Sequence, residues 1–359
     1  MKYYYHKLLI KYNNSININL LINNDKQLEK YIEDIKDDSV LGIDTEFRRI
    51  DSYFPELCLI QIASRDYLEC IDVLSINNLE PLFDKLYDGK TLWVIHSARQ
   101  DIEALYYLSN RIPNLLFDTQ VGASFLNYPL QVSYQTITEK LQNVLLEKKY
   151  TRFNWRKRPL PNDVLQYALD DVKYLLPNYR MLKKELINQG KLSWAEEEVE
   201  FLLNKDTYEP NYIKIFKKTK GIAKISNKNQ ENAFKLIYWR ESVAQQKDKP
   251  RKWIMPDESL IGYANGKKKL SNSQNKLFEN FIKKSKLKVR LEDALVAQKP
   301  LSESEKLLKN QLKDRINHLS IKYAIPSELI CSSKNLVKLI KEDNTLSIKS
   351  GWRSELFKL

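Results

Sequence analysis

The chain has 359 residues, of which 43% are hydrophobic and 29% charged, a composition typical of globular proteins and long enough for two or three domains. Its three cysteines, Cys58, Cys70 and Cys331, are odd in number and far apart, which argues against a disulfide framework or a zinc cluster. No stretch approaches about 18 uncharged apolar residues, and the first residues do not resemble a signal peptide. We therefore expect a soluble, cytoplasmic protein that does not associate with membranes.

Charge is distributed unevenly between the two halves of the chain. Residues 1–200 contain 25 Lys and Arg against 29 Asp and Glu, whereas residues 201–359 contain 34 against 17. A Lys-rich composition of the whole proteome would have made both halves basic. The second half is therefore expected to bind a polyanion such as a nucleic acid.

Apolar runs predict strands in the first half of the chain, at residues 39–44, 57–63, 67–73 and 91–96. Apolar residues at helical spacing predict helices there at residues 79–86, 101–108 and 162–176. Strand signals stop near residue 205, and the remaining segments predict helices at residues 229–246, 258–264, 272–284 and 302–323. This pattern indicates an α/β domain of about 200 residues, followed by an all-α region with a break near Pro300.

Two carboxylates end the first predicted strand. Asp44 and Glu46 are two residues apart, so both side chains point to the same face of a sheet. Like charges held that close repel each other unless a cation lies between them, and oxygen ligands suit Mg²⁺ or Mn²⁺. The spacing alone is not decisive, because Asp-x-Glu recurs at Asp101 and Glu103.

Two further acidic residues, Asp101 and Asp171, are candidates for the same site. Asp101 follows a strand and starts a helix, where a carboxylate is commonly stabilised by the helix dipole alone. Tyr167 and Asp171 lie four residues apart on one helix face, an arrangement that is most often a tyrosine at the edge of the core and a solvated acid. Asp170 points about 100° away from Asp171.

The combination of these elements is far more specific than its parts, and it resembles the ribonuclease D family of DEDD exonucleases. The motifs that carry the resemblance are residues 44–48 (Asp-Thr-Glu-Phe-Arg), 96–101, 117–120, 155–160 and 167–172. Residues 238–246 and 249–257 resemble the helical HRDC domain that follows the nuclease in that family, and residues 351–353 resemble its closing segment.

The resemblance implies an α/β ribonuclease H-like nuclease domain with a mixed sheet flanked by helices, followed by an all-α, HRDC-type region. We accordingly expect an exonuclease domain at residues 1–205, an HRDC-like domain at 206–300 and a shortened second HRDC-like segment at 301–359. Asp118 lies in one of the motifs but is not needed to complete the family's set of metal ligands.

The resemblance also implies a 3′→5′ exoribonuclease that uses two divalent metal ions, Mg²⁺ or Mn²⁺, and releases 5′-mononucleotides. The ligands it implies are Asp44, Glu46, Asp101 and Asp171, and Tyr167 would orient the attacking water. The implied substrate is RNA with a single-stranded 3′ end, such as a tRNA precursor, and a monomer is favoured.

Several residues are candidates for contacts with nucleic acid. They are Phe47, beside the catalytic pair, the loop residues Arg156, Lys157 and Arg158, and, in the basic half, Arg251, Lys252, Lys283 and Lys284. Core packing is the alternative for Phe47, and an ordinary solvated loop is the alternative for the three loop cations. Trp253 lies beside Arg251 and Lys252, a combination typical of surfaces on which bases stack, and burial in a small helical core is the favoured alternative.

Two rival functions remain at this point. A DNA exonuclease would use the same chemistry, and no motif for a contact to the 2′-hydroxyl is legible. A non-catalytic nucleic-acid-binding protein with a relic nuclease fold is the rival from another class. The presence of all four carboxylates and the tyrosine argues against it, because loss of function usually removes a ligand.

Overall fold

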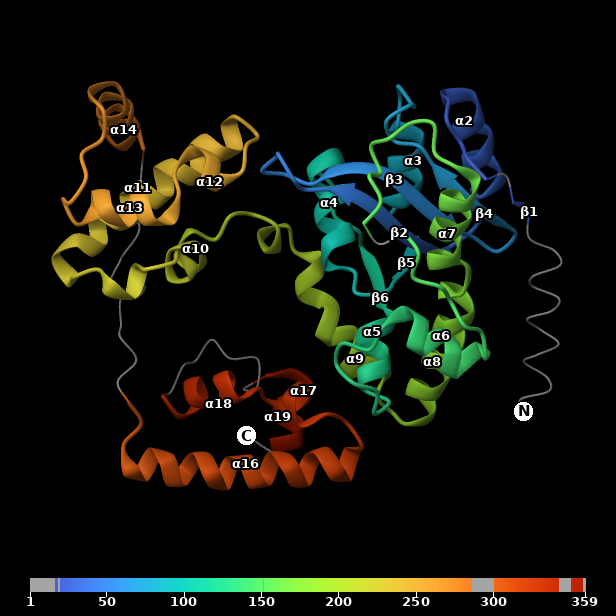
Figure 1. Cartoon of the computed structure of the whole chain (residues 1–359). Coiled ribbons are helices and arrows are strands. Elements are labelled where there is room, and N and C mark those ends of the chain that lie inside the picture. The colour runs from blue at the N-terminus through green and yellow to red at the C-terminus, as the bar shows by residue number, and fades with distance from the viewer. Residues whose placement is uncertain (1–16, 19, 151, 286–299, 342–349, 358–359) are drawn as a thin grey trace. The chain divides into compact units, whose positions relative to one another are not determined.

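The computed structural model describes residues 17–18, 20–150, 152–285, 300–341 and 350–357 (Figure 1). Their contacts divide the chain into two compact units. Unit 1 draws on residues 1–48, 57–207 and 301–359, and unit 2 on residues 49–56 and 208–300. Each unit is therefore assembled from segments that are far apart in the sequence.

Unit 1 is organised around a mixed sheet, to which the described residues contribute six strands in the order β1-β4-β3-β2-β5-β6. The strands are β1 (Asn17–Ile18), β2 (Val40–Arg48), β3 (Glu56–Ala63), β4 (Tyr67–Ile71), β5 (Leu92–Ile95) and β6 (Leu115–Asp118). β2 runs parallel to β5, and β5 parallel to β6, whereas β3 and β4 are antiparallel. The predicted strands are thus confirmed, and β2, which ends in the carboxylate pair, lies in the interior of the sheet.

Helices cover both faces of this sheet. They are α2 (Asp25–Asp34), α3 (Glu80–Leu86), α4 (Arg99–Ser109), α5 (Thr119–Ser124), α6 (Tyr134–Gln142), α7 (Asn162–Lys173), α8 (Leu175–Asn188) and α9 (Leu192–Val199), followed by the short 3-10 turns η1 (Glu200–Leu203) and η2 (Lys205–Thr207). α7 and α8 pack on the face that carries Gly42, where an added Cβ would lie only 3.1 Å from the Cβ of Leu175. Glycine at this position lets α8 approach the sheet closely. α3 lies on the other face, where the indole nitrogen of Trp93 donates to the carbonyl oxygen of Leu86 at 2.8 Å.

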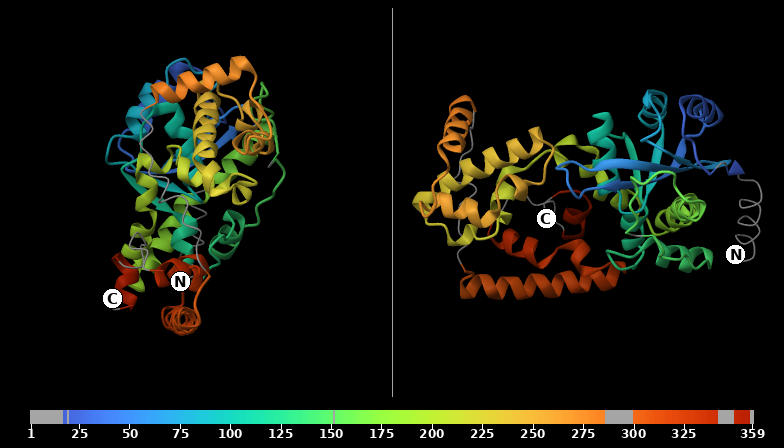
Figure 2. Two further views of the ribbon diagram at one scale, coloured as in Figure 1. Left: turned by 90° about the vertical axis from the view of Figure 1, so that its left-hand side faces the viewer. Right: turned by 45° about the horizontal axis from the view of Figure 1, so that its top comes forward.

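The last described segment of the chain packs onto unit 1. It contains α16 (Glu303–Tyr323), α17 (Ser327–Ile330), α18 (Ser333–Ile340) and α19 (Gly351–Phe357), and Figures 1 and 2 show the three short helices lying along α16. Trp352 is buried and stacks on Trp194 of α9, with ring centroids 5.4 Å apart and planes 19° apart. Its backbone N–H donates to Oε2 of Glu197 at 2.9 Å.

Glycine is required at the start of this last helix. Gly351 has a φ of 58°, and an added Cβ would lie 1.8 Å from Oε1 of Glu197. The sequence predicted residues 301–359 as a separate helical segment, and its contacts place it in unit 1. Its resemblance to an HRDC domain stays a prediction.

Unit 2 is helical, apart from the loop that it takes from the β2–β3 connection. Its helices are α10 (Tyr212–Lys218), the 3-10 turn η3 (Ile222–Lys224), α11 (Asn227–Gln246), α12 (Arg251–Ile254), α13 (Asp257–Ala264) and α14 (Asn272–Lys284). The loop of residues 49–56 is held by Asp248, whose Oδ1 accepts the backbone N–H groups of Tyr53 at 2.9 Å and Phe54 at 3.0 Å. The helices predicted for this region are confirmed.

None of the helices that the structure describes is both long and apolar enough to cross a bilayer.

Candidate metal centre

The first part of the candidate site is the end of strand β2. The apolar run before Asp44 is buried between the helical layers, and this burial holds the strand in place. Asp44 and Glu46 follow Gly42 at intervals of two, so all three share the face that α7 and α8 cover. Both carboxylates are half-buried.

Helix α7 brings the third carboxylate to this face. Its apolar stripe includes Val164, Leu165, Ala168, Leu169 and Val172, all buried against the sheet. This packing fixes the rotation of the helix. Carboxylate oxygens of Asp44, Glu46 and Asp171 lie within 4.8 Å of one another. Residues that are about 125 positions apart in the sequence thus meet as the DEDD pattern predicted.

Asp101 approaches from the opposite face of β2. It lies in the first turn of α4 and is 7% exposed, and its Oδ1 accepts a hydrogen bond of 2.6 Å from Oγ1 of Thr45. Thr45 stands between Asp44 and Glu46, so this bond ties the fourth carboxylate to the strand that carries the other two.

The turn that places Asp101 depends on a residue that was not predicted to belong to the site. Ser97, in this turn, has a φ of 66°, a conformation that non-glycine residues rarely adopt. The carboxylate of Asp118 accepts the N–H groups of Ser97 at 3.0 Å and Ala98 at 2.8 Å, and also that of Gln120 at 2.8 Å. Asp118 therefore both caps α5 and holds the start of α4. Its place in the motif Phe-Asp-Thr-Gln was the only sequence signal for this role.

The pKa of each of the four acidic groups is raised. Burial, followed by the charges of Asp101, Asp171 and Glu46, raises the pKa of Asp44 well above its ordinary value. Burial and the charge of Asp171 raise the pKa of Glu46 to about 9. Burial raises the pKa of Asp101 and of Asp171 to about 7 each.

The described residues provide no cationic side chain to balance the three closest carboxylates of this cluster. Within the described part of the chain, no lysine, arginine or histidine forms an ion pair with Asp44, Glu46 or Asp171. Half-buried carboxylates at such short separations repel each other, and a hard divalent cation is the partner that relieves this repulsion. The donor set, made only of carboxylate oxygens, fits Mg²⁺ or Mn²⁺.

Tyr167 lies one helical turn before Asp171 on α7, and it is half-buried. Partial burial and the charges of Asp171, Glu46 and Asp44 raise the pKa of its hydroxyl, which stays protonated at neutral pH. The ring of Tyr150 packs edge-on against the ring of Tyr167, with centroids 5.7 Å apart, and the Tyr150 hydroxyl donates to Asp163 of the same helix. No pattern in the sequence pointed to this role of Tyr150.

The candidate nucleic-acid contacts of unit 1 differ in what they touch. Arg158 donates from Nη2 to Asp72 Oδ1 and from Nε to Asp72 Oδ2, both at 2.6 Å, and also to the carbonyl oxygen of Cys58. These bonds bind Arg158 to the interior of unit 1. Lys157 is exposed and Phe47 is half-buried, and their contacts with nucleic acid, like those of Arg156, stay predictions.

In unit 2, the basic candidates lie at the surface. Lys252, Lys283 and Lys284 are exposed, and Arg251 lies 3.6 Å from the buried carboxylate of Glu241. The expectation that Trp253 is buried was wrong, because its side chain is 64% exposed. α12 is a single turn in which none of the four residues is buried, so helical periodicity could not have assigned Trp253 a buried face.

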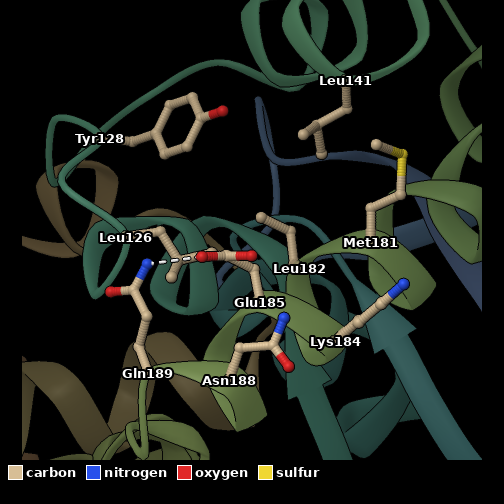
Figure 3. Close-up of a pocket in the computed structure, with 9 residues that line it drawn as sticks. All are labelled: Leu126, Tyr128, Leu141, Met181, Leu182, Lys184, Glu185, Asn188 and Gln189. Carbon is tan, nitrogen blue, oxygen red and sulfur yellow. Dashed lines mark hydrogen bonds between the residues drawn. The ribbon is translucent and has the colours of Figure 1, made fainter. Parts of the chain in front are cut away.

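A groove of about 450 Å³ lies elsewhere in unit 1 (Figure 3). It is lined by Leu126, Tyr128, Leu141, Met181, Leu182, Lys184, Glu185, Asn188 and Gln189. Gln189 donates to Glu185 at 2.8 Å, as the dashed line in Figure 3 marks. None of the predicted site residues lines this groove.

Comparison with known proteins gives the class of this fold and site. Residues 20–187 match a family described as 3′–5′ exonuclease. Ribonuclease D of Bartonella henselae is 34% identical, over 94% of this chain and 87% of that protein. Ribonuclease D of Sphingobium indicum is 30% identical, over 95% and 92%. The matched 3′–5′ exonuclease region contains all four carboxylates and Tyr167.

The chain belongs to the ribonuclease D family. The crystal structure of Escherichia coli RNase D, described as an exoribonuclease involved in structured RNA processing, superposes with a TM-score of 0.81 and 25% identity, covering 96% of this chain and 97% of that one. The predicted fold class and the predicted enzyme class, a 3′→5′ exoribonuclease, are thereby confirmed.

Proposed function

We propose that the exoribonuclease activity depends on two divalent cations, Mg²⁺ or Mn²⁺, held by Asp44, Glu46, Asp101 and Asp171. The observation that carries this proposal is the group of carboxylate oxygens from β2 and α7 within 4.8 Å of one another. Bound there, divalent cations would activate water and neutralise the charge that develops on the attacking and leaving oxygens.

The other groups of the site act around these carboxylates. Asp101 supports the site from the second face of β2, through the hydrogen bond from Thr45. Tyr167 keeps its proton at neutral pH, so its Oη can donate a hydrogen bond that orients the attacking water toward the phosphate. Tyr150 limits the motion of the Tyr167 ring. Hydrolysis from the 3′ end would release 5′-mononucleotides.

The proposed substrate is RNA with a single-stranded 3′ end, and tRNA precursors are the class that fits the family resemblance best. The involvement of the Escherichia coli relative in structured RNA processing supports this choice. The excess of basic residues after position 200 supplies a surface that attracts phosphates. We also propose that the protein works as a monomer in the cytoplasm.

The test is an assay of RNA shortening with an internal control for the acidic positions. A 5′-labelled tRNA precursor with a 3′ extension and its DNA equivalent are incubated with Mg²⁺, Mn²⁺ or EDTA. Three proteins are compared: the wild type, Asp44→Asn and Asp170→Asn. Asp170 neighbours Asp171 on α7 but lies outside the carboxylate group, so its variant is the matched control.

We expect the RNA to shorten from its 3′ end with a divalent ion, both in the wild type and in Asp170→Asn. EDTA and Asp44→Asn should each abolish the reaction. Shortening in EDTA would contradict the metal proposal. Faster degradation of the DNA than of the RNA would identify DNA as the preferred substrate. Removal of the 3′ extension at the same rate from an unstructured RNA would argue against tRNA precursors in particular.

A further inference from the structure

Gln61 is a polar residue in the apolar interior of unit 1. It lies in the middle of β3, and its side chain is fully buried. Among the described residues, neither its Nε2 nor its Oε1 has a hydrogen-bond partner. A buried amide without partners loses its hydration and gains nothing in return, so an apolar side chain of the same size would be more stable there.

The sheet places this amide beside the candidate metal centre. β2 and β3 are neighbours joined by the short loop of residues 49–55, a connection that only antiparallel strands allow. An added Cβ on Gly42 would lie 3.3 Å from the Cβ of Ala63, so these two residues stand opposite each other and share a face. Because the strands are antiparallel, Asp44, two residues after Gly42, is opposite Gln61, two residues before Ala63, and both lie on that same face.

On the same face of the sheet, Gln61 also has a neighbour on the next strand, β4. Gln61 pairs with Cys70 of β4 in the antiparallel register. Burial and the charge of Glu69 raise the pKa of the Cys70 thiol most. The charges of Glu46 and Asp44 raise it further. Gln61 stands between this thiol and the carboxylates, on the face that α7 covers.

We propose that Gln61 is a positioning residue of the metal centre: its buried side-chain amide would hydrogen-bond and orient Asp44 when the carboxylates hold a divalent cation. An amide offers a donor and an acceptor from one planar group, so it can donate to a carboxylate and accept from a water. Groups in this outer position orient metal ligands in other proteins, and their loss commonly weakens metal binding. This inference rests on the proposed metal-dependent function.

The test measures cation binding in the absence of RNA. The variant is Gln61→Met, which keeps the length of the side chain and removes both polar atoms. The control is Ile62→Met, which changes the next residue of β3, also fully buried, on the opposite face of the sheet. Mn²⁺ affinity is measured by calorimetric titration, and the melting temperature of each protein is measured in EDTA.

We expect Gln61→Met to bind Mn²⁺ roughly tenfold or more weakly, while its melting temperature in EDTA equals or exceeds that of the wild type. Ile62→Met should keep the affinity of the wild type. If Gln61→Met does not fold, Gln61→Leu, which is also apolar and is smaller, provides the same comparison.

An affinity for Mn²⁺ that is unchanged in Gln61→Met would overturn the inference and leave the metal-dependent function standing. A lower melting temperature in EDTA with unchanged affinity would show that the amide serves the fold instead. Failure of the wild-type protein to bind Mn²⁺ at all would overturn the proposed function, and the inference with it.

Discussion

Asp44, Glu46 and Asp171 of unit 1 have no cationic side chain as a partner among the described residues, whereas the buried Glu241 and the half-buried Asp257 of unit 2 are both paired with Arg240. Arg240, 1% exposed, donates to Asp257 at 2.6 Å and to Glu241 at 3.2 Å. Burial raises the pKa of Asp257, but the hydrogen bonds from Arg240 and from the backbone N–H of Lys220, together with the charges of Arg240 and Lys252, lower that pKa overall. In the metal centre, the pKa of every acid is raised.

This contrast distinguishes a charge cluster that serves the fold from one that serves function. A cluster that serves the fold contains its own counter-charge, and removal of one member destabilises the protein. A cluster that serves function keeps its like charges together at a cost in stability, so removal of one member should stabilise the metal-free protein while activity is lost.

The largest expected effect follows from Glu46→Gln. Loss of one of the closely spaced carboxylates should lower kcat by roughly 10³-fold or more, since it removes several kcal/mol of transition-state stabilisation. The same variant should melt at a higher temperature than the wild type in EDTA, because a neutral amide avoids the cost of burying an ionisable carboxyl group beside Asp171 and Asp101, which raises the pKa of Glu46 to about 9. Melting curves in EDTA and single-turnover rates in Mg²⁺ measure both. A lower melting temperature would remove the distinction between the two clusters.

The opposite result is expected in unit 2 for Arg240→Met. It leaves Glu241 and Asp257 without their shared guanidinium, and breaking a buried pair costs about 3–5 kcal/mol of folding free energy. Urea unfolding followed by circular dichroism measures this loss. The control on the same helix is Lys235→Met, which breaks an exposed pair with Glu231 and should cost less than about 1 kcal/mol. Equal losses in the two variants would contradict the structural role of the Arg240 cluster.

The raised pKa values of the metal centre should make the stability of the protein depend on pH. Glu46, Asp101 and Asp171 have pKa values of about 9, 7 and 7 in the folded protein, above their ordinary values near 4. The folded state therefore binds more protons than the unfolded chain, and its stability falls as the pH rises from about 4 to 9. In EDTA, the melting temperature should fall by on the order of 5 °C between pH 5 and pH 9.

Saturating Mg²⁺ should remove most of that fall in stability, because the cation takes the place of the protons. Melting curves at each pH, with EDTA or with Mg²⁺, provide the comparison. The same slope in Asp44→Asn as in the wild type would show that other groups cause the pH dependence.

A smaller effect is expected from the ring that supports Tyr167. Tyr150→Ala removes the edge-on contact at 5.7 Å, and such aromatic pairs contribute about 0.5–1.5 kcal/mol, so kcat should fall roughly three- to tenfold. Tyr150→Phe keeps the ring and loses only the hydrogen bond to Asp163, so it should keep most of the activity. Steady-state kinetics on RNA measure both, and an effect confined to KM would point to substrate contact instead.

The smallest expected effect concerns the exposed lysines of unit 2. If Lys283 and Lys284 contact phosphates, their double replacement by alanine should weaken RNA binding. It should also reduce the slope of log affinity against log salt by about 1.4. Lys306→Ala, an exposed lysine of α16 paired with Glu303, serves as the control and should leave the slope unchanged. An unchanged slope in the double variant would remove these two lysines from the binding surface.

Much of the fold and site was predictable because it is encoded locally. Strand β2 starts as an apolar run and helix α7 has an apolar stripe, and the acids stand at fixed offsets within them, so strand and helix geometry assign Asp44, Glu46 and Asp171 to faces of their elements. The family pattern then joins the three acids in one site, and the observed separation of their oxygens agrees with it.

The remaining features depend on long-range contacts that leave little trace in the sequence. Asp118 acts through backbone N–H groups about 20 residues away, and a backbone donor does not reveal its partner in the identity of its own side chain. Gln61 had one visible signal, a polar residue inside an apolar strand, but its meaning depends on the neighbour across the sheet. The hydrogen bond from the backbone N–H of Tyr53 to Asp248 joins positions 195 residues apart, and no periodic pattern in the sequence could have predicted it.

The stacking of Trp352 on α9 has a consequence for the newborn chain on the ribosome. The hydrogen bond from Trp352 to Glu197 spans 155 residues, so at about 5–20 residues per second its donor is synthesised roughly 8–30 s after its acceptor. During that interval, Trp194 and Phe125 lack the indole that later packs against both of them. The layer that covers α9 is thus added late in translation, and until then this apolar surface is open to chaperones.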